Sequence, residues 1–348
     1  MRVLATLPQD DLNDVPAAAR AAEAAGYDGL VTMENRNEPF LALGVAAVAT
    51  TRIGLVTGIA VAFARSPMAV ANASWDLQRA SRGRFVLGLG SQVRAHNEHR
   101  FSVKWTPPAP RLREYAEALR VIWRCWEKGD TLDYQGQHYR FTLMTPNFVP
   151  TSTHQPMVPV TLAAVGPAML RVAGEVADGV RLHPFCTRRY IDEVVTRELR
   201  AGFAKGGRAR ERFEVSGGGF VATGADAAAV AAMVEWVRYR IAFYGSTPAY
   251  WPVLEVHGLG ELGRKLNVMS KAGQWDAMAR EISDDDVRLF AAVGTHRELA
   301  KAVAERFGGV ADTIALSGGY GMRQDIPPDL VQDLQRIETP FTGFSAGW

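Results

Sequence analysis

Short apolar runs alternate with helical segments along most of the chain. The runs cover residues 3–7, 28–33, 53–60, 85–89, 158–164, 179–182, 213–221 and 313–316. They are continuous rather than alternating with polar residues, which indicates strands buried on both faces, as in a parallel sheet. Each has a partner helix, so the pattern predicts an α/β fold, a closed (β/α)8 TIM barrel. An open doubly wound sheet would normally have fewer strands and a Gly-x-Gly-x-x-Gly turn after the first, where this chain reads PQDDLND.

Two stretches interrupt the alternation. Residues 92–110, after the fourth strand, are polar and basic and end in prolines, and residues 241–282 include AFYGSTPAYWP. Long excursions of this kind on a barrel are usually active-site lids or substrate loops. Residues 131–142 alternate around Gln135-Gly136 and predict a β-hairpin. We therefore expect one barrel domain over residues 1–348, with insertions after strands four and seven.

Composition and charge exclude several classes of function. The 39 basic and 37 acidic residues are mixed along the chain and form no basic stripe, so no nucleic-acid partner is expected. The two cysteines, Cys125 and Cys186, have no metal-ligand or disulfide spacing. Residues 40–64 are apolar enough to suggest a membrane span, but Arg52 interrupts them, and a buried helix followed by a buried strand explains them better. We expect a cytoplasmic protein without a membrane segment.

The predicted carboxyl ends of the strands, which face the active site of a barrel, are small and neutral. They are Leu7-Pro8-Gln9, Glu34-Asn35, Gly58-Ile59-Ala60, Gly90-Ser91-Gln92, Ala164-Val165-Gly166, Leu182-His183, Gly219-Phe220 and Gly318-Gly319. They lack the His-x-His of a metal-dependent hydrolase and the lysine of a Schiff-base aldolase, so no metal is expected. Glycine-rich ends instead suit a large planar cofactor lying close to the backbone.

The turn at residues 163–169, AAVGPAM, is the best candidate for a phosphate site. A strand ends there, a Gly-Pro turn follows, and a helix begins with its free N–H groups facing the strand end. An ordinary β-α turn without a ligand explains the same residues and stays open as an alternative.

Several motifs in this order resemble the luciferase-like oxidoreductases. They are RIGLVTG (52–58), RSP (65–67), SRGRFVLGLG (81–90), REY (113–115), Gly166-Pro167, AGEVADG (173–179) and the hairpin DYQGQHYRF. The segments IAFYGSTPAY and SKAGQWDAM resemble the coenzyme F420 branch of that superfamily more closely than its FMN-dependent monooxygenases.

The resemblance implies a deazaflavin lying across the barrel mouth. Its phosphate would meet Ser91, Gln92 and the turn from Ala164 through Val165, Gly166, Pro167 and Ala168 to Met169. Glu34 would face the cofactor. Many relatives have a bulge with a non-proline cis peptide in strand three, which supports the cofactor ring from behind. In this chain it falls at Gly58-Ile59, next to Thr57. His96 occupies the place of a polar cofactor contact, although an exposed loop histidine with no role is an equal alternative.

The chain also departs from the family pattern. Sugar-phosphate dehydrogenases of this family have Asp-His after strand two and glutamate after strand four, where this chain has Glu34-Asn35 and Val93. That activity is not expected, and Glu34, Asn35 and His96 remain the candidates for catalytic roles, Asn35 only as a hydrogen-bond donor.

The aromatic residues of the excursions predict a hydrophobic small-molecule substrate, unless they are core residues. They are Phe63, Trp105, Tyr244, Tyr250 and Trp251. Arg94, Arg100 and Lys104 would meet the acidic tail of F420 or form a solvated basic face. The alternatives to an F420-dependent enzyme are an FMN-dependent monooxygenase with a partner reductase and oxygen, and a cofactor-binding protein without catalysis. The resemblance also implies a homodimer formed through helices near strands two to four.

Overall fold

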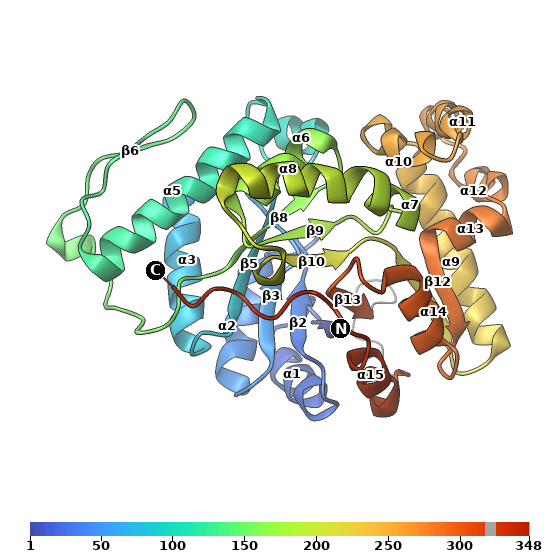
Figure 1. Cartoon of the computed structure of the whole chain (residues 1–348), viewed down its shortest axis with the longest axis horizontal. Coiled ribbons are helices and arrows are strands. Elements are labelled where there is room, and N and C mark those ends of the chain that lie inside the picture. Colours follow the sequence, from blue (N-terminus) through green and yellow to red (C-terminus); the bar gives the residue numbers. More distant parts are fainter. Residues whose placement is uncertain (317–324, 348) are drawn as a thin grey trace.

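The computed structural model describes residues 1–316 and 325–347, and within them eight parallel strands close into a barrel (Figure 1). These strands are β1 (Arg2–Thr6), β2 (Gly29–Thr32), β3 (Gly54–Thr57), β5 (Phe85–Gly90), β8 (Val160–Ala164), β9 (Gly179–Leu182), β10 (Glu214–Gly217) and β13 (Thr313–Leu316). The pairings β1–β13 and β3–β5 close the ring. The predicted (β/α)8 barrel is confirmed.

Helices cover the outside of the barrel (Figure 1). They are α1 (Val15–Ala24), α2 (Pro39–Ala49), α3 (Pro67–Ala80), α5 (Pro108–Lys128), α6 (Pro167–Val176), α8 (Thr196–Gly206), α14 (Leu299–Phe307) and α15 (Pro328–Gln335). The apolar residues 40–64 form α2, β3 and the turn after them, as predicted. In the part of the chain that the structure describes, no helix has the length and apolar character needed to cross a membrane.

The third predicted strand, residues 53–60, is interrupted by a bulge. Leu55 and Val56 pair with Phe85 and Val86, whereas the short strand β4 (Ala60–Val61) pairs with Leu89 and Gly90. The register therefore slips by one residue, and the bulge that the resemblance implied in strand three is confirmed. The peptide bond between Gly58 and Ile59 is cis, at the position that the resemblance implied.

The seventh predicted strand, residues 213–221, is also divided. Gly217 and Gly218 have φ angles of +83° and +102°, which turn the chain away from the barrel after β10. The next strand, β11 (Phe220–Gly224), pairs with β12 (Ala291–Thr295) instead of a barrel strand. The sequence pattern did not predict β12.

The excursion after strand seven is longer and more helical than the predicted residues 241–282. It consists of α9 (Ala227–Gly245), α10 (Trp251–Glu255), α11 (Gly260–Lys271), α12 (Trp275–Met278) and α13 (Asp284–Phe290). Short 3-10 segments at Pro248–Tyr250 and Ala279–Glu281 join them. These helices stand beside the barrel, on the right of Figure 1.

The excursion after strand four is mostly irregular and contains α4 (Arg94–His99) before α5 begins. The predicted hairpin is confirmed as the antiparallel pair β6 (Tyr134–Gln135) and β7 (Arg140–Phe141). The remaining short elements are 3-10 turns at Pro146–Phe148 and Arg210–Arg212, the helix α7 (Arg188–Tyr190) and a π-helical turn at Ile191–Val195 that leads into α8.

A small cluster of aliphatic side chains fills part of the barrel interior. Leu4, Val31, Val56 and Val86, from four neighbouring strands, pack together, and Phe344 of the carboxyl-terminal tail packs against them. In barrels of this kind, the site is expected at the carboxyl ends of the strands.

Candidate functional site

The carboxyl ends of the barrel strands meet at one end, as predicted, and the loops that follow them carry most of the predicted site residues. The end of the eighth strand, with Gly318 and Gly319, lies outside the described residues. Within residues 1–316 and 325–347, no group of three His, Cys, Asp or Glu side chains could hold a metal ion.

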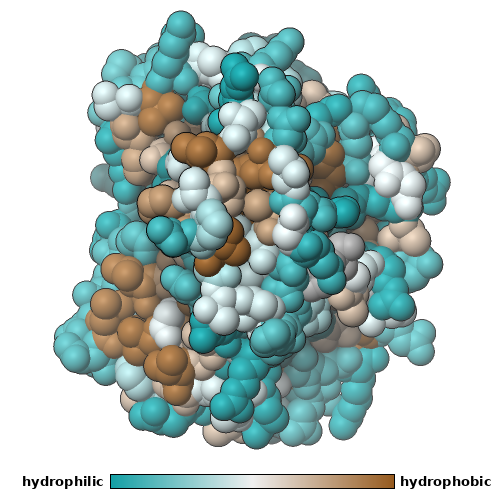
Figure 2. Space-filling model, turned by 90° about the vertical axis from the view of Figure 1, so that its left-hand side faces the viewer, coloured by the Kyte–Doolittle hydropathy of each residue, from teal (hydrophilic) through white to brown (hydrophobic). Residues whose placement is uncertain are grey.

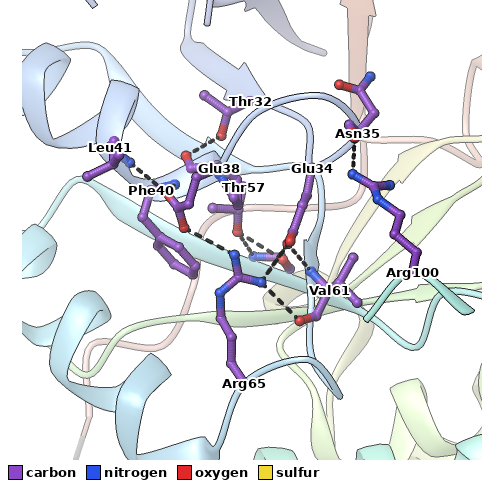
Figure 3. A network of polar contacts seen from close by, with 12 residues as sticks. Thr32, Glu34, Asn35, Glu38, Phe40, Leu41, Thr57, Val61, Arg65 and Arg100 are labelled. Atoms are coloured by element: carbon purple, nitrogen blue, oxygen red, sulfur yellow. Dashed lines mark hydrogen bonds and ion pairs between the residues drawn. The ribbon is translucent and has the colours of Figure 1, made fainter. Parts of the chain in front are cut away.

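Glu34, which follows β2, is held by other protein groups (Figure 3). Its carboxylate accepts hydrogen bonds from Arg65 Nη1 at 2.7 and 2.9 Å and from the Val61 backbone N–H at 2.6 Å. Its backbone N–H donates to the Ile59 carbonyl at 3.2 Å. Its side chain is only 6% exposed, so Glu34 anchors both sides of the strand-three bulge. This geometry gives Glu34 a positioning role, while direct contact with a cofactor stays a prediction.

Glycines allow protein groups to pack closely against the backbone inside the barrel next to that bulge. A Cβ atom on Gly88 would lie 1.9 Å from the Thr57 carbonyl oxygen, and one on Gly90 would lie 2.8 Å from Ile59 Cδ1. The buried Thr57 hydroxyl donates to the Gly88 carbonyl and accepts the Gly88 N–H, both at 2.8 Å. The Thr57 side chain therefore joins β3 to β5. Of the three residues predicted to contact a cofactor here, Thr57 is buried, whereas Gly58 and Ile59 are partly exposed.

The predicted phosphate turn has the expected form. Ala164 ends β8, Gly166 precedes the helix, and α6 begins at Pro167 without a side-chain cap. Pro167 and Ala168 are exposed, so the backbone N–H groups of the first turn face solvent. The Tyr190 hydroxyl donates to the Val165 carbonyl at 2.9 Å and fixes the turn from behind. An anion could bind here through the backbone alone.

Ser91, Gln92 and His96 follow strand four. Asn97, which is fully buried, donates its side-chain amide to the carbonyls of Ser91 and Val93 at 2.9 and 3.0 Å. These bonds fix the loop between β5 and α4. His96 is exposed on α4, where it could contact a ligand at the mouth but is not held toward one.

Arg100 connects this loop to strand two, because its guanidinium donates to the backbone carbonyl of Asn35 (Figure 3). The Asn35 side-chain oxygen accepts the N–H of Arg36 at 2.6 Å. Arg94 pairs with Glu98 one turn later on α4, at 2.9 Å. Of the three basic residues suggested for an acidic tail, Arg94 and Arg100 thus have partners within the protein. Lys104 is exposed.

His183, directly after β9, lies among aromatic rings from the helical excursion. The ring centroids of Tyr244 and Tyr250 are 4.3 and 4.6 Å from its imidazole centroid. Its Nδ1 accepts the Phe185 backbone N–H at 3.0 Å, so the proton of the neutral ring resides on Nε2. Burial, and then the charge of Arg240, lower the pKa of His183 to about 3. His183 is therefore a neutral hydrogen-bond donor, which the sequence analysis did not single out.

The five predicted substrate residues do not all gather in one place. Tyr244 and Tyr250 flank His183. Phe63 is 4% exposed and lies under the guanidinium of Arg111, 4.2 Å from ring centroid to Cζ. Trp251 donates from Nε1 to the Gly245 carbonyl at 3.0 Å, and Trp105 is half-buried in the segment between α4 and α5.

Three further residues shape the site, namely Arg65, His183 and Arg240. His183 could have been found from its position after a strand. Arg240 precedes Tyr244 by one helical turn and donates to its hydroxyl at 2.6 Å, a spacing that the sequence does reveal. The contact between Glu34 and Arg65 spans 31 residues, and no local pattern signals it.

Comparison with known proteins assigns this chain to a family. Residues 2–313 match the luciferase-like monooxygenase family. The chain belongs to this family. The luciferase-like chain is 49% identical over 302 residues to an uncharacterised protein of Mycobacterium tuberculosis (strain ATCC 25618 / H37Rv), covering 85% of this chain and 89% of that protein. It is 28% identical over 328 residues to the 5,10-methylenetetrahydromethanopterin reductase of Archaeoglobus fulgidus, covering 91% of each.

The fold of the luciferase-like chain is also similar to that of the coenzyme F420 dependent tetrahydromethanopterin reductase from Methanopyrus kandleri. The TM-score is 0.75 at 20% identity, with 97% of each chain covered. The luciferase-like family contains oxidoreductases that use F420 and others that use FMN.

Proposed function

We propose that this protein is an F420-dependent oxidoreductase, which transfers a hydride between the deazaflavin and a hydrophobic organic substrate. The observation that carries the proposal is the neutral, glycine-lined mouth of the barrel. Glu34, the acidic residue after strand two, is neutralised by Arg65, and the ring of His183 is uncharged. Hydride transfer relies on position and exclusion of water more than on side-chain acids and bases. A putative coenzyme F420-dependent oxidoreductase of Mycobacterium tuberculosis, 28% identical over 298 residues and 82% of this chain, supports the same choice.

The residues at the mouth fit such a cofactor. A planar ring needs close approach to backbone, and the partly exposed Gly58 and Ile59 of the bulge would provide it. Glycine is required at position 58, because a Cβ atom there would lie 2.4 Å from Val31 Cγ2. A phosphate needs backbone N–H groups that no capping side chain already occupies. The first turn of α6, which begins at Pro167 without a side-chain cap, provides them. When bound, the deazaflavin would supply the carbon that donates or accepts hydride.

The chain's own residues would orient the substrate. His183 presents its Nε2 proton, held there by the Phe185 N–H, and would donate a hydrogen bond to a carbonyl or hydroxyl oxygen. Tyr244 and Tyr250 would provide an apolar wall against the rest of the molecule. Both come from the helical excursion, so that segment would cover the mouth and keep water out.

Parallel titrations with F420 and FMN, followed by cofactor fluorescence, test the proposal. We expect micromolar binding of F420 and no binding of FMN. FMN binding alone would overturn the F420 assignment in favour of a monooxygenase. Bound reduced F420 that no electron acceptor oxidises would indicate a binding protein without catalysis, and binding of neither cofactor would contradict both enzymatic functions.

Substitutions at Ala168 test the phosphate turn in the same assay. Ala168→Asp adds a negative charge beside the backbone donors of α6, which would repel a phosphate but stabilise the helix itself. We expect F420 to bind at least about tenfold more weakly, with an unchanged or higher melting temperature. Ala168→Asn, of equal size and no charge, is the control and should retain affinity within about threefold.

We also propose that two copies of the chain associate through α2. Leu41 and Val48 on its outer face are 60% and 78% exposed, and no residue of this helix is polar. A surface helix normally turns polar residues outward, so such a face indicates a binding surface.

A further inference from the structure

A buried arginine crosses the interior of the barrel below the mouth. Arg181, on β9, is 9% exposed. Its Nε donates to the Thr161 hydroxyl on β8 at 3.0 Å, and its Nη1 donates to the Ser216 hydroxyl on β10 at 3.3 Å. The guanidinium is thus fixed by the strands on either side of its own.

The cluster around Arg181 carries one positive charge in excess. Glu214 is shared between two arginines: its Oε1 accepts from Arg2 Nη1 at 2.8 Å and from the Thr313 hydroxyl at 2.6 Å. Its Oε2 lies 3.7 Å from Arg181 Nη2, and neither of these two buried atoms has a hydrogen-bond partner among the described residues. Burial lowers the pKa of Arg181 while Glu214 opposes this change, and a guanidinium still remains protonated near neutral pH.

This charge lies directly beneath the glycine-lined mouth. A Cβ atom on Gly88 would lie 2.9 Å from Arg181 Nε, and one on Gly58 would lie 3.9 Å from Arg181 Nη1. A side chain at position 88 would displace the guanidinium, whereas a Cβ atom at position 58 would only touch it. Ile59, which follows Gly58, contacts Gly90 with its side chain and forms the next level toward the mouth. Arg181 therefore lies directly against Gly58, the first residue of the cis peptide in the bulge.

We propose that Arg181 stabilises the reduced cofactor over the oxidised one through its buried charge. A ring bound there that accepted a hydride from the substrate would gain one unit of negative charge before any proton followed. A fixed positive charge a few ångströms away, in surroundings of low dielectric constant, favours that form. This inference rests on the proposed function, because it requires a redox-active ring on the bulge. It predicts that the charge of Arg181, rather than a group touching the ring, determines how much more tightly the site binds the reduced cofactor than the oxidised one.

The test compares the dissociation constants of oxidised and reduced F420, measured anaerobically, for the wild type and three variants. Arg181→Met removes the charge at similar length, and we expect the ratio of the oxidised to the reduced constant to fall by about tenfold, which is about 1.4 kcal/mol. Arg181→Lys keeps the charge and should leave the ratio within about threefold. Glu214→Gln removes the buried negative charge and should change the ratio in the opposite direction.

The outcomes separate the inference from the proposed function. If neither F420 nor FMN binds the wild type, the proposed function fails and this inference fails with it. If FMN binds instead, the same ratio is measured with FMN. A cofactor that binds with the same ratio in all four proteins would make Arg181 a packing residue and overturn the inference, while the proposed function would stand. If Arg181→Met does not fold, Glu214→Gln alone tests the inference. The inference requires that this variant raise the ratio of the oxidised to the reduced dissociation constant above that of the wild type.

Discussion

A single hydrogen bond fixes the chemical state of His183. The Phe185 N–H occupies Nδ1, and burial next to Arg240 keeps the ring uncharged. A histidine of this kind cannot act as a switch near neutral pH, and it can donate only from Nε2. The same properties make the stability of the protein depend on pH in a defined direction.

The pKa of His183 falls from about 6.5 in the unfolded chain to about 3 in the folded protein. Between these values the unfolded state binds one more proton, so His183 should lower the free energy of unfolding as pH falls below 6.5. The slope from this group approaches about 1.4 kcal/mol per pH unit. Urea unfolding at pH 5.0 to 7.5 should show that His183→Asn, which keeps an acceptor for the Phe185 N–H, loses this slope. His96→Asn, on the exposed side of α4, is the control, and equal slopes in wild type and His183→Asn would refute the assigned state.

At the level of elements, the bulge between β3 and β4 is held from strand two. Glu34 binds both the Ile59 carbonyl, through its backbone, and the Val61 N–H, through its carboxylate. Arg65, at the start of the segment leading into α3, neutralises that carboxylate and also contacts Glu38 at 3.3 Å. The loops after strands two and three are therefore one unit.

Glu34→Gln should loosen this unit without removing its shape. The amide oxygen can still accept the Val61 N–H, but Arg65 then retains only Glu38 as a charged partner. We expect a loss of about 1–3 kcal/mol in the free energy of unfolding and a severalfold higher dissociation constant for the cofactor. Glu98→Gln, which breaks the exposed pair with Arg94, should change neither. An unchanged stability and cofactor affinity, combined with a large loss of turnover, would instead favour direct participation of Glu34 in the reaction.

The elements differ in how far their sequence determined them. Runs such as Phe85–Gly90 are buried on both faces, and their continuous apolar pattern predicted every strand of the barrel. The excursion over residues 220–295 was predicted only in part. Gly217 and Gly218 redirect the chain after β10, and β12 is recognisable only through its pairing with β11. Within the candidate site, Glu34 and the turn before α6 could be predicted because both directly follow a predicted strand. The partners Arg65 and Arg181 could not be inferred, since long-range contacts leave no local pattern.

For the molecule as a whole, α2 presents an apolar surface that the barrel does not cover. Phe40 and Leu43 pack inward, while Leu41 and Val48 are exposed on the outside, with the partly buried Val45 between them at positions i, i+4 and i+7. Figure 2, which views the left-hand side of Figure 1, shows apolar side chains gathered in patches between polar ones. A second copy of the chain is the partner we propose for α2, because identical apolar stripes can cover each other around a twofold axis.

Charges on this stripe should separate the two copies. Leu41→Glu/Val48→Glu places four carboxylates in the interface of a twofold dimer, so we expect the dimer dissociation constant to rise by at least about tenfold. Light scattering coupled to size exclusion would report the change in mass. Val268→Glu, on α11 and 68% exposed, is the matched control and should leave the mass unchanged. A monomeric wild type, or a double variant that remains dimeric, would exclude α2 as the interface.

The interface would also be linked to the site through the start of α2. The Glu38 carboxylate accepts the N–H groups of Phe40 and Leu41 at 2.7 and 2.9 Å and contacts Arg65, the partner of Glu34. Fixing α2 in a dimer should therefore help to fix the bulge, and dissociation should weaken cofactor binding moderately. Linkage requires the converse as well, so saturating cofactor should lower the dimer dissociation constant by the same factor. A dimer dissociation constant that does not change with cofactor would show that dimer formation and cofactor binding are not coupled.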